Sequence, residues 1–167
     1  MTIQAVFFDM GGTIDTFGFT REYRILNVHY IKDCLASVSI ALKLSDEQLA
    51  DSITTGASDY LRWNMISSVE LSPAEIWSKF FLKRQCISVQ ELSPIAEELA
   101  FIYETKLYHR EMRKEIPAVL AKIKEMGFRL GVISNTQSLN QVRFNLEQYG
   151  ILNYFDPIVL SSEYGRR

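Results

Sequence analysis

A carboxylate beside a glycine pair is the first feature of this sequence that could do chemistry. Asp9 follows the apolar run Val6–Phe8 and comes just before Gly11, Gly12 and Thr13. A carboxylate is ionised at neutral pH and can attack an electrophile without a base to activate it. The glycines allow a tight turn that brings backbone close to a ligand, and Thr13 adds a hydroxyl. Together these residues are suited to an anion, although an Asp before glycines is more often only a turn residue.

A second polar segment follows another apolar run. Ser134 and Asn135 come directly after residues 129–133, a short stretch that predicts a buried strand. Taken alone, this pair most often caps the helix that follows. In open parallel sheets, however, ligands bind beyond the carboxyl ends of the strands. If the two strands are neighbours, Asp9 and Ser134 are expected to share one cleft.

The elements that must position these residues alternate between strands and helices. Strands are expected at 6–8, 129–133 and 157–160, with helices at 117–126 and 138–149. Strand, helix, strand, helix, strand indicates a parallel sheet with right-handed crossovers. The predicted fold class is therefore α/β, with a Rossmann-like parallel sheet as its core.

A long helical segment interrupts this core. The pattern predicts an all-helical domain over residues 18–108, inserted into a discontinuous core of residues 1–17 and 109–167. Capping-box sequences at Ser45 and Ser72 and a Ser93-Pro94 start predict helices near 20–43, 46–65, 73–86 and 94–108. Six aromatic residues are expected to form one apolar face in the core of this bundle: Trp63, Trp77, Phe80, Phe81, Phe101 and Tyr103.

The motifs at the two polar segments resemble those of the haloacid dehalogenase superfamily. Phe7–Thr13 is similar to the first motif of that superfamily, and Val132–Asn135 is similar to the second. The helical segment between them resembles a cap domain, and Glu163–Arg167 resembles the approach to the third motif. The resemblance implies that Asp9 attacks phosphorus to form an aspartyl-phosphate. It also implies that Ser134, Asn135 and backbone amides near Gly11, Gly12 and Thr13 hold the oxygens of the transferring group.

The resemblance further implies a magnesium ion. In the family this metal is bound by the nucleophile, here Asp9, by the backbone carbonyl two residues later, here Gly11, and by a late acidic motif, with a lysine assisting. Magnesium would neutralise charge and orient the phosphoryl group. The printed sequence ends at Arg167, before that lysine and that acidic motif. We therefore expect little or no turnover from residues 1–167 alone.

One residue within the first motif also departs from the family pattern. Its phosphatases carry a general acid two residues after the nucleophile, and this chain has Gly11 there. General acid–base help is worth roughly 10² to 10⁴ in rate, and whether Asp15 could replace it is left open. Relatives that cleave carbon–phosphorus or carbon–halogen bonds also lack this acid, so a phosphonatase-like or dehalogenase-like hydrolase is one alternative. Lys32 or Lys43 would then be candidates for a Schiff-base lysine.

Another alternative is a catalytically impaired module that binds a phosphorylated ligand or a protein. Composition favours a small phosphorylated molecule as the partner over nucleic acid or membrane, because the net charge of −2 comes from interspersed charges and no apolar stretch is long enough to span a bilayer. Cys34 and Cys86 lack metal-ligand spacing, and a cytoplasmic location is expected. The apolar first strand would be a poor open edge, so we expect either that residues 1–167 are a fragment of a longer product or that a homodimer or a swapped partner covers this edge.

Overall fold

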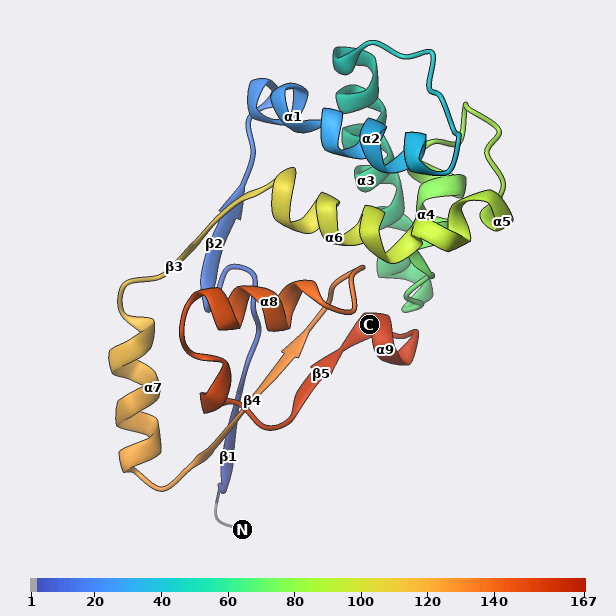
Figure 1. The fold of residues 1–167 in the computed structure, drawn as a ribbon. Coiled ribbons are helices and arrows are strands. Elements are labelled where there is room, and N and C mark those ends of the chain that lie inside the picture. Colours follow the sequence, from blue (N-terminus) through green and yellow to red (C-terminus); the bar gives the residue numbers. More distant parts are fainter. Residues whose placement is uncertain (1–2) are drawn as a thin grey trace.

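The computed structural model describes residues 3–167 and contains two packed units, a sheet-based core and a helical cap (Figure 1). The core sheet has three parallel strands in the order β1 (Ala5–Phe8), β4 (Arg129–Ser134) and β5 (Ile158–Leu160). Phe8 of β1 lies opposite Val132 of β4, and Ser134 lies opposite Leu160 of β5. The predicted α/β class and the neighbouring positions of the first two core strands are confirmed.

Helices alternate with these strands as expected. α7 (Ile116–Glu125) precedes β4, α8 (Gln141–Gln148) precedes β5, and the short α9 (Ser161–Tyr164) follows it. Gly127 and Gly150 adopt positive φ angles after α7 and α8, which is the conformation that ends helices most easily at glycine. The first of the two helices starts one residue earlier than predicted, and the second starts three residues later, because Ser138 Oγ caps it from outside, accepting from the Asn140 and Gln141 amides.

A two-stranded antiparallel ribbon, which the sequence pattern does not predict, joins the core to the cap. β2 (Asp15–Gly18) pairs with β3 (His109–Met112), and Gly18 lies opposite His109. Figure 1 shows β2 running from the core toward the helical unit and β3 running back from that unit to the core. Because β2 and β3 lie at the two ends of the inserted segment, they tie its exit to its entry.

The cap is built from short helices around one longer helix. Its elements are α1 (Arg21–Asn27), α2 (His29–Ser37), α3 (Asp46–Ser67), α4 (Pro73–Ile76), η1 (Trp77–Phe81), α5 (Val89–Leu92), η2 (Ser93–Ile95) and α6 (Ala96–Lys106). The capping boxes at Ser45 and Ser72 form as predicted. The single helix expected over 20–43 is wrong: it is divided at Val28, and α2 ends at Ser37, near Ser39 with a φ of +64°. The last cap helix was expected to start at Ser93-Pro94, but helical structure begins at Val89 behind a third capping box at Ser88.

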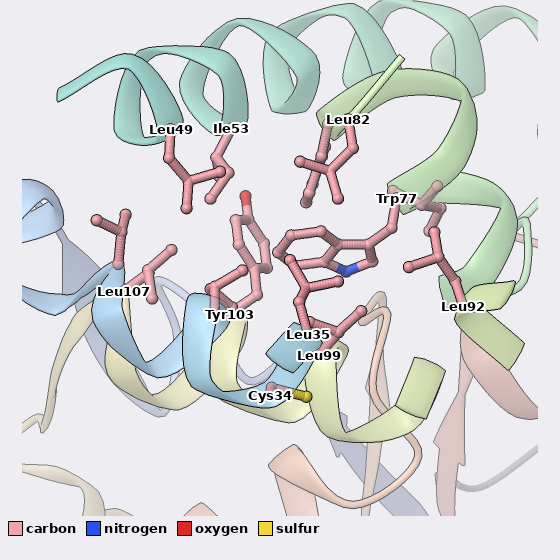
Figure 2. Close-up of a cluster of buried hydrophobic side chains, with 14 of the residues drawn as sticks. Cys34, Leu35, Leu49, Ile53, Trp77, Leu82, Leu92, Leu99, Tyr103 and Leu107 are labelled. Carbon is pink, nitrogen blue, oxygen red and sulfur yellow. The ribbon is translucent and has the colours of Figure 1, made fainter. Parts of the chain in front are cut away.

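The hydrophobic core of the cap surrounds Trp77. Figure 2 shows Tyr103 beside Trp77, with leucines from several cap helices directed toward the same interior. Trp77, Phe81 and Tyr103 are buried there as predicted, and the rings of Trp77 and Phe81 meet edge to face. The expectation of one continuous aromatic face is wrong in part. Trp63 remains 37% exposed, and Phe101 leaves the cap interior to contact Phe144 of the core.

Two surface features complete the fold. Within residues 3–167, no helix combines the length and the apolar character that a membrane crossing requires. β1 is an edge strand of its sheet, and Phe7 on it is 47% exposed. The ring of Phe7 lies across Gly131 of β4, where a Cβ would approach it to 2.4 Å, so glycine at 131 allows the two strands to pack.

Candidate active site

The parallel pairing of β1 and β4 brings the two polar segments to one edge of the sheet. Asp9 is the first residue after β1, and Ser134 is the last residue of β4. Asp9, Gly11, Ser134 and Asn135 all line a cavity of about 510 Å³. Because cap residues line the same cavity, it lies between the core and the cap. Its volume is within the usual range for a small-molecule site.

A tight turn positions Asp9. The Met10 carbonyl accepts hydrogen bonds from the amides of Ile14 and Asp15, at 2.9 and 3.1 Å. The buried side chains of Met10 and Ile14 anchor this turn in the core. The Asp9 carboxylate remains exposed, and its Oδ1 accepts from the Met10 amide at 2.7 Å. The turn therefore presents a carboxylate to the cavity and fixes one of its oxygens.

Gly12 and Thr13 are the two predicted site residues that do not line the cavity. Both are exposed, and Gly12 has a φ of +83°, which favours glycine. The Gly12 carbonyl accepts from Arg113 at 3.2 Å, and the Gly12 amide donates to the Asp15 carbonyl at 2.7 Å. In this conformation these two residues shape the turn and do not reach the cavity wall.

The segment after β4 is held by a network of buried hydroxyls. The Thr136 amide donates to Ser161 Oγ at 3.0 Å, and Thr136 Oγ1 donates to Gln141 Oε1 at 3.2 Å. Ser134 is buried, whereas Asn135 is exposed to the cavity. The hydroxyl of Ser134 and the amide group of Asn135 are thus presented beside Asp9 on a fixed backbone.

The sequence profile of haloacid dehalogenase-like hydrolases matches residues 3–167. The chain belongs to this family. A HAD phosphatase from Thermococcus onnurineus matches with 22% identity, 96% of this chain and 63% of that chain covered, and a TM-score of 0.49. A predicted phosphoglycolate phosphatase from Haemophilus somnus 129PT has 15% identity, covers 95% of this chain with 63% of its own length, and gives a TM-score of 0.51.

The family match over residues 3–167 confirms the resemblance inferred from the two motifs. The chain spans 63% of the length of each of these two structures. At 15% identity the Haemophilus structure bears on the fold alone. The comparison with curated proteins found no match.

Asp15 does not replace the general acid that the haloacid dehalogenase-like phosphatases carry, because it does not line the cavity. This side chain is fully buried, and both of its oxygens accept hydrogen bonds from Arg110, at 3.4 and 3.3 Å. Tyr149 donates to the same carboxylate at 3.1 Å. Burial raises the pKa of Asp15, while the Arg110 guanidinium lowers it. Asp15 serves as a structural anchor for the ribbon between core and cap.

Arg110 also holds a second buried carboxylate at this junction. Its Nη2 donates to Glu104 Oε2 at 2.9 Å, and its Nε donates to the Glu104 carbonyl at 3.0 Å. Burial raises the pKa of Glu104, and attraction to Arg110 opposes that rise. Glu104 and Arg110 both line the cavity, but they form an ion pair with each other. Their charges are largely compensated before any ligand arrives.

Asp9 and Gly11 offer oxygen ligands of the kind that magnesium prefers. The Asp9 carboxylate lines the cavity, and no hydrogen bond from the described residues occupies the Gly11 carbonyl. Magnesium prefers oxygen ligands and often keeps several waters beside one or two carboxylates. No group of three acidic, histidine or cysteine side chains within residues 3–167 could hold a metal by itself. Asp9 and Gly11 would therefore supply part of a magnesium site.

The cap contributes residues that sequence reasoning missed. Arg24, Asn64 and Tyr103 line the cavity from the cap side, and Gln137 lines it from the core. Nothing in the local sequence separates Arg24, which is buried, from Arg21 three residues earlier, which is exposed. Lys32 and Lys43 are absent from the cavity lining, and Lys32 is bound to Asp46 at 2.6 Å.

Proposed function

We propose that this chain carries the nucleophile of a phosphatase that hydrolyses a small phosphate ester. The observation that supports it best is the shared cavity, in which Asp9, Ser134 and Asn135 lie on the core side beneath the helical cap. The family consists of hydrolases, and a carboxylate nucleophile needs no neighbouring base to activate it, which agrees with this chemistry.

In the proposed reaction, an oxygen of the Asp9 carboxylate attacks phosphorus as the bond from phosphorus to the ester oxygen breaks. The ester oxygen leaves with the bonding electrons and takes a proton from water. A second water then attacks the phosphorus of the aspartyl-phosphate, which releases inorganic phosphate and restores Asp9. Ser134 and Asn135 would donate hydrogen bonds to the phosphoryl oxygens and hold them in line.

Asp9 and the Gly11 carbonyl would hold magnesium, which supplies positive charge against the phosphoryl oxygens when it is bound. Gly11 cannot transfer a proton, and Asp15 is bound to Arg110. The leaving group is therefore protonated from solvent, and esters of acidic alcohols should react fastest. The missing general acid also supports a second candidate function, a module that binds a phosphorylated ligand without turnover.

The test uses the longest natural chain that contains these residues. It would be assayed with p-nitrophenyl phosphate and magnesium, with and without a chelator, beside Asp9→Asn and a matched control, Asp33→Asn, whose side chain is exposed on α2. We expect activity that needs magnesium, is abolished in Asp9→Asn and is retained in Asp33→Asn, with phosphate trapped on Asp9 after acid quenching. Activity that survives in Asp9→Asn would exclude this mechanism, and no turnover despite phosphate binding would favour the binding module.

The carbon–phosphorus alternative has less support. Among the residues that line the cavity there is no lysine, and a Schiff base needs one.

We also propose that a homodimer or a swapped partner covers the edge of β1 that has no neighbouring strand within residues 3–167, where Phe7 is exposed. Sedimentation of the longest natural chain would check this, and a stable monomer would contradict it.

A further inference from the structure

Arg24 is a buried cation without an acidic partner. Its side chain is 1% exposed, and no carboxylate of the described residues forms an ion pair with it. Burying a charge without a counter-charge is costly, and buried polar groups nearly always have partners. A cation kept in this state therefore requires an explanation, and a ligand is one.

The contacts that Arg24 does make leave one edge of its guanidinium free. Nη1 donates to Thr54 Oγ1 at 2.7 Å, and the carbon of the guanidinium lies 3.4 Å from the centroid of the Phe19 ring. Nε and Nη2 have no hydrogen-bond partner in the described part of the chain. These two nitrogens form the pair of parallel donors that binds both oxygens of a carboxylate, or two oxygens of a phosphate.

The cavity that Asp9 lines also reaches Arg24. Arg24 lines that cavity, together with Asn64 and Gln137, whose buried side chains also have unpartnered polar atoms. The other arginines of the lining are compensated within the described residues. Arg110 pairs with Asp15 and Glu104, and Arg167 pairs with Glu70. Among the described residues that line the cavity, Arg24 is therefore the one arginine whose charge has no acidic partner.

We propose that Arg24 is a specificity-determining residue that receives a second anionic group of the substrate. The substrate would then be a phosphorylated acid, with its reacting phosphate beside Asp9 and its other anionic end on the Nε and Nη2 edge of Arg24. Asn64 can donate to or accept from polar atoms between these ends. This inference rests on the proposed function for the position of the reacting phosphate, but the anion site at Arg24 can be tested by itself.

The surroundings suit this role. Nε and Nη2 are shielded from water, and charge-assisted hydrogen bonds are stronger where solvent does not compete. Phe19 stacks on the guanidinium and is itself 40% exposed, so Arg24 lies close to the surface of the molecule. Thr54 fixes the guanidinium on its other side, and Thr54 Oγ1 is itself bound to the Ala50 carbonyl at 2.8 Å.

Calorimetric titration would test the site. Magnesium is left out so that the proposed phosphatase cannot turn over the probes. The probes are phosphorylated hydroxy acids of increasing chain length, each beside the alkyl phosphate of the same length, with diol bisphosphates and unphosphorylated hydroxy acids as further arms. At the chain length that fits, the phosphorylated acid should bind roughly ten- to a hundredfold tighter than its alkyl counterpart. Tighter binding of the bisphosphate would assign the second group to phosphate, and tighter binding of the acid would assign it to carboxylate.

Variants connect this preference to Arg24. Arg24→Met should remove the preference for the acid over the alkyl phosphate of the same length, and Arg24→Lys should keep part of that preference. Arg21→Met, on the same helix but exposed, is the matched control and should retain the preference. If circular dichroism shows that Arg24→Met does not fold, Thr54→Val is the second variant. It keeps the charge of Arg24, removes the hydrogen bond from Nη1 and should weaken the preference for the acid.

The outcomes separate this inference from the proposed function. Equal binding of acids and alkyl phosphates at every length, or a preference that survives in Arg24→Met, would overturn the role of Arg24 and leave the phosphate site intact. Hydroxy acids that bind through Arg24 while no phosphate ester binds would support the anion site and contradict the phosphatase. Binding of none of the probes would overturn both.

Discussion

The ring of Phe17 occupies the space that a side chain at residue 11 would need. A Cβ built on Gly11 would lie 2.8 Å from Cε1 and 3.1 Å from Cδ1 of that ring. Phe17 is held on β2, where its ring meets Tyr108 edge to face and lies 5.0 Å from the Arg110 guanidinium carbon. The glycine that replaces the family's general acid and the aromatic residue beside it therefore form one local arrangement.

Restoring the acid should require changing both residues. Gly11→Asp alone is expected to cost about 1–3 kcal/mol in free energy of unfolding, because the ring must shift to admit the new side chain. Gly11→Asp with Phe17→Ala should cost less than the sum of the single changes, and urea unfolding of the four proteins would measure this. In the longest natural chain, the double variant should raise phosphatase activity by up to roughly 10²-fold. Gly18→Ala, which has open space around its Cβ, is the control, and strict additivity would contradict the coupling.

The positions of Asp9 and Ser134 could be predicted because their signals are local. An apolar run that stops at a polar residue marks the end of a buried strand, and Gly127 and Gly150 mark helix ends by their conformation. The order of strands and helices then determines which residues share an edge. For the same reason, the family motifs and the α/β class were accessible from sequence.

What could not be predicted depends on contacts between distant residues. β2 and β3 were missed because neither Asp15–Gly18 nor His109–Met112 alternates apolar and polar residues, and their pairing forms only when the whole insertion folds. The division of the first cap helix at Val28 carries no glycine or proline signal. The burial of Arg24 likewise arises from rings on other segments, such as Phe19 and Tyr108.

Glu97 of the cap should control how firmly the cap rests on the core. Its carboxylate accepts hydrogen bonds from Ser138 Oγ at 2.6 Å and from the amides of Leu139 and Asn140 at 3.0 and 3.2 Å, next to the start of α8. Glu97→Ala should cost about 1–3 kcal/mol and speed hydrogen exchange of those two amides. Glu98→Ala, one residue along and exposed, is the control. Unchanged exchange in Glu97→Ala would show that these bonds do not hold the cap.

Gly56 should be the least replaceable glycine of the cap. A Cβ at this position of α3 would lie 2.6 Å from the Phe80 carbonyl oxygen and 2.8 Å from Phe81 Cα, both of which are backbone atoms. Gly56→Ala is therefore expected to lose about 1–3 kcal/mol or more by overpacking, despite the better helix propensity of alanine. Thermal unfolding followed by tryptophan fluorescence, to which the buried Trp77 contributes, would measure this loss. A variant as stable as the parent would mean that α3 and η1 can separate without cost.

Arg110 should make its largest contribution to stability near neutral pH. Burial raises the pKa of both Asp15 and Glu104, so the folded state holds protons more tightly than the unfolded state, and stability falls as pH rises above about 4. Arg110→Met removes the cation that lowers both pKa values. The pKa of both carboxyls should then rise further, so the free energy of unfolding should fall more strongly, and up to a higher pH, than in the parent. The loss should reach about 3–5 kcal/mol near pH 7 and be smaller near pH 4. Urea unfolding across this range would measure it, with Arg113→Met, an exposed arginine paired with Glu115, as the control that should show little change at any pH. A loss that is equally large at both ends of the range would mean that Arg110 acts through packing and not through the two buried carboxylates.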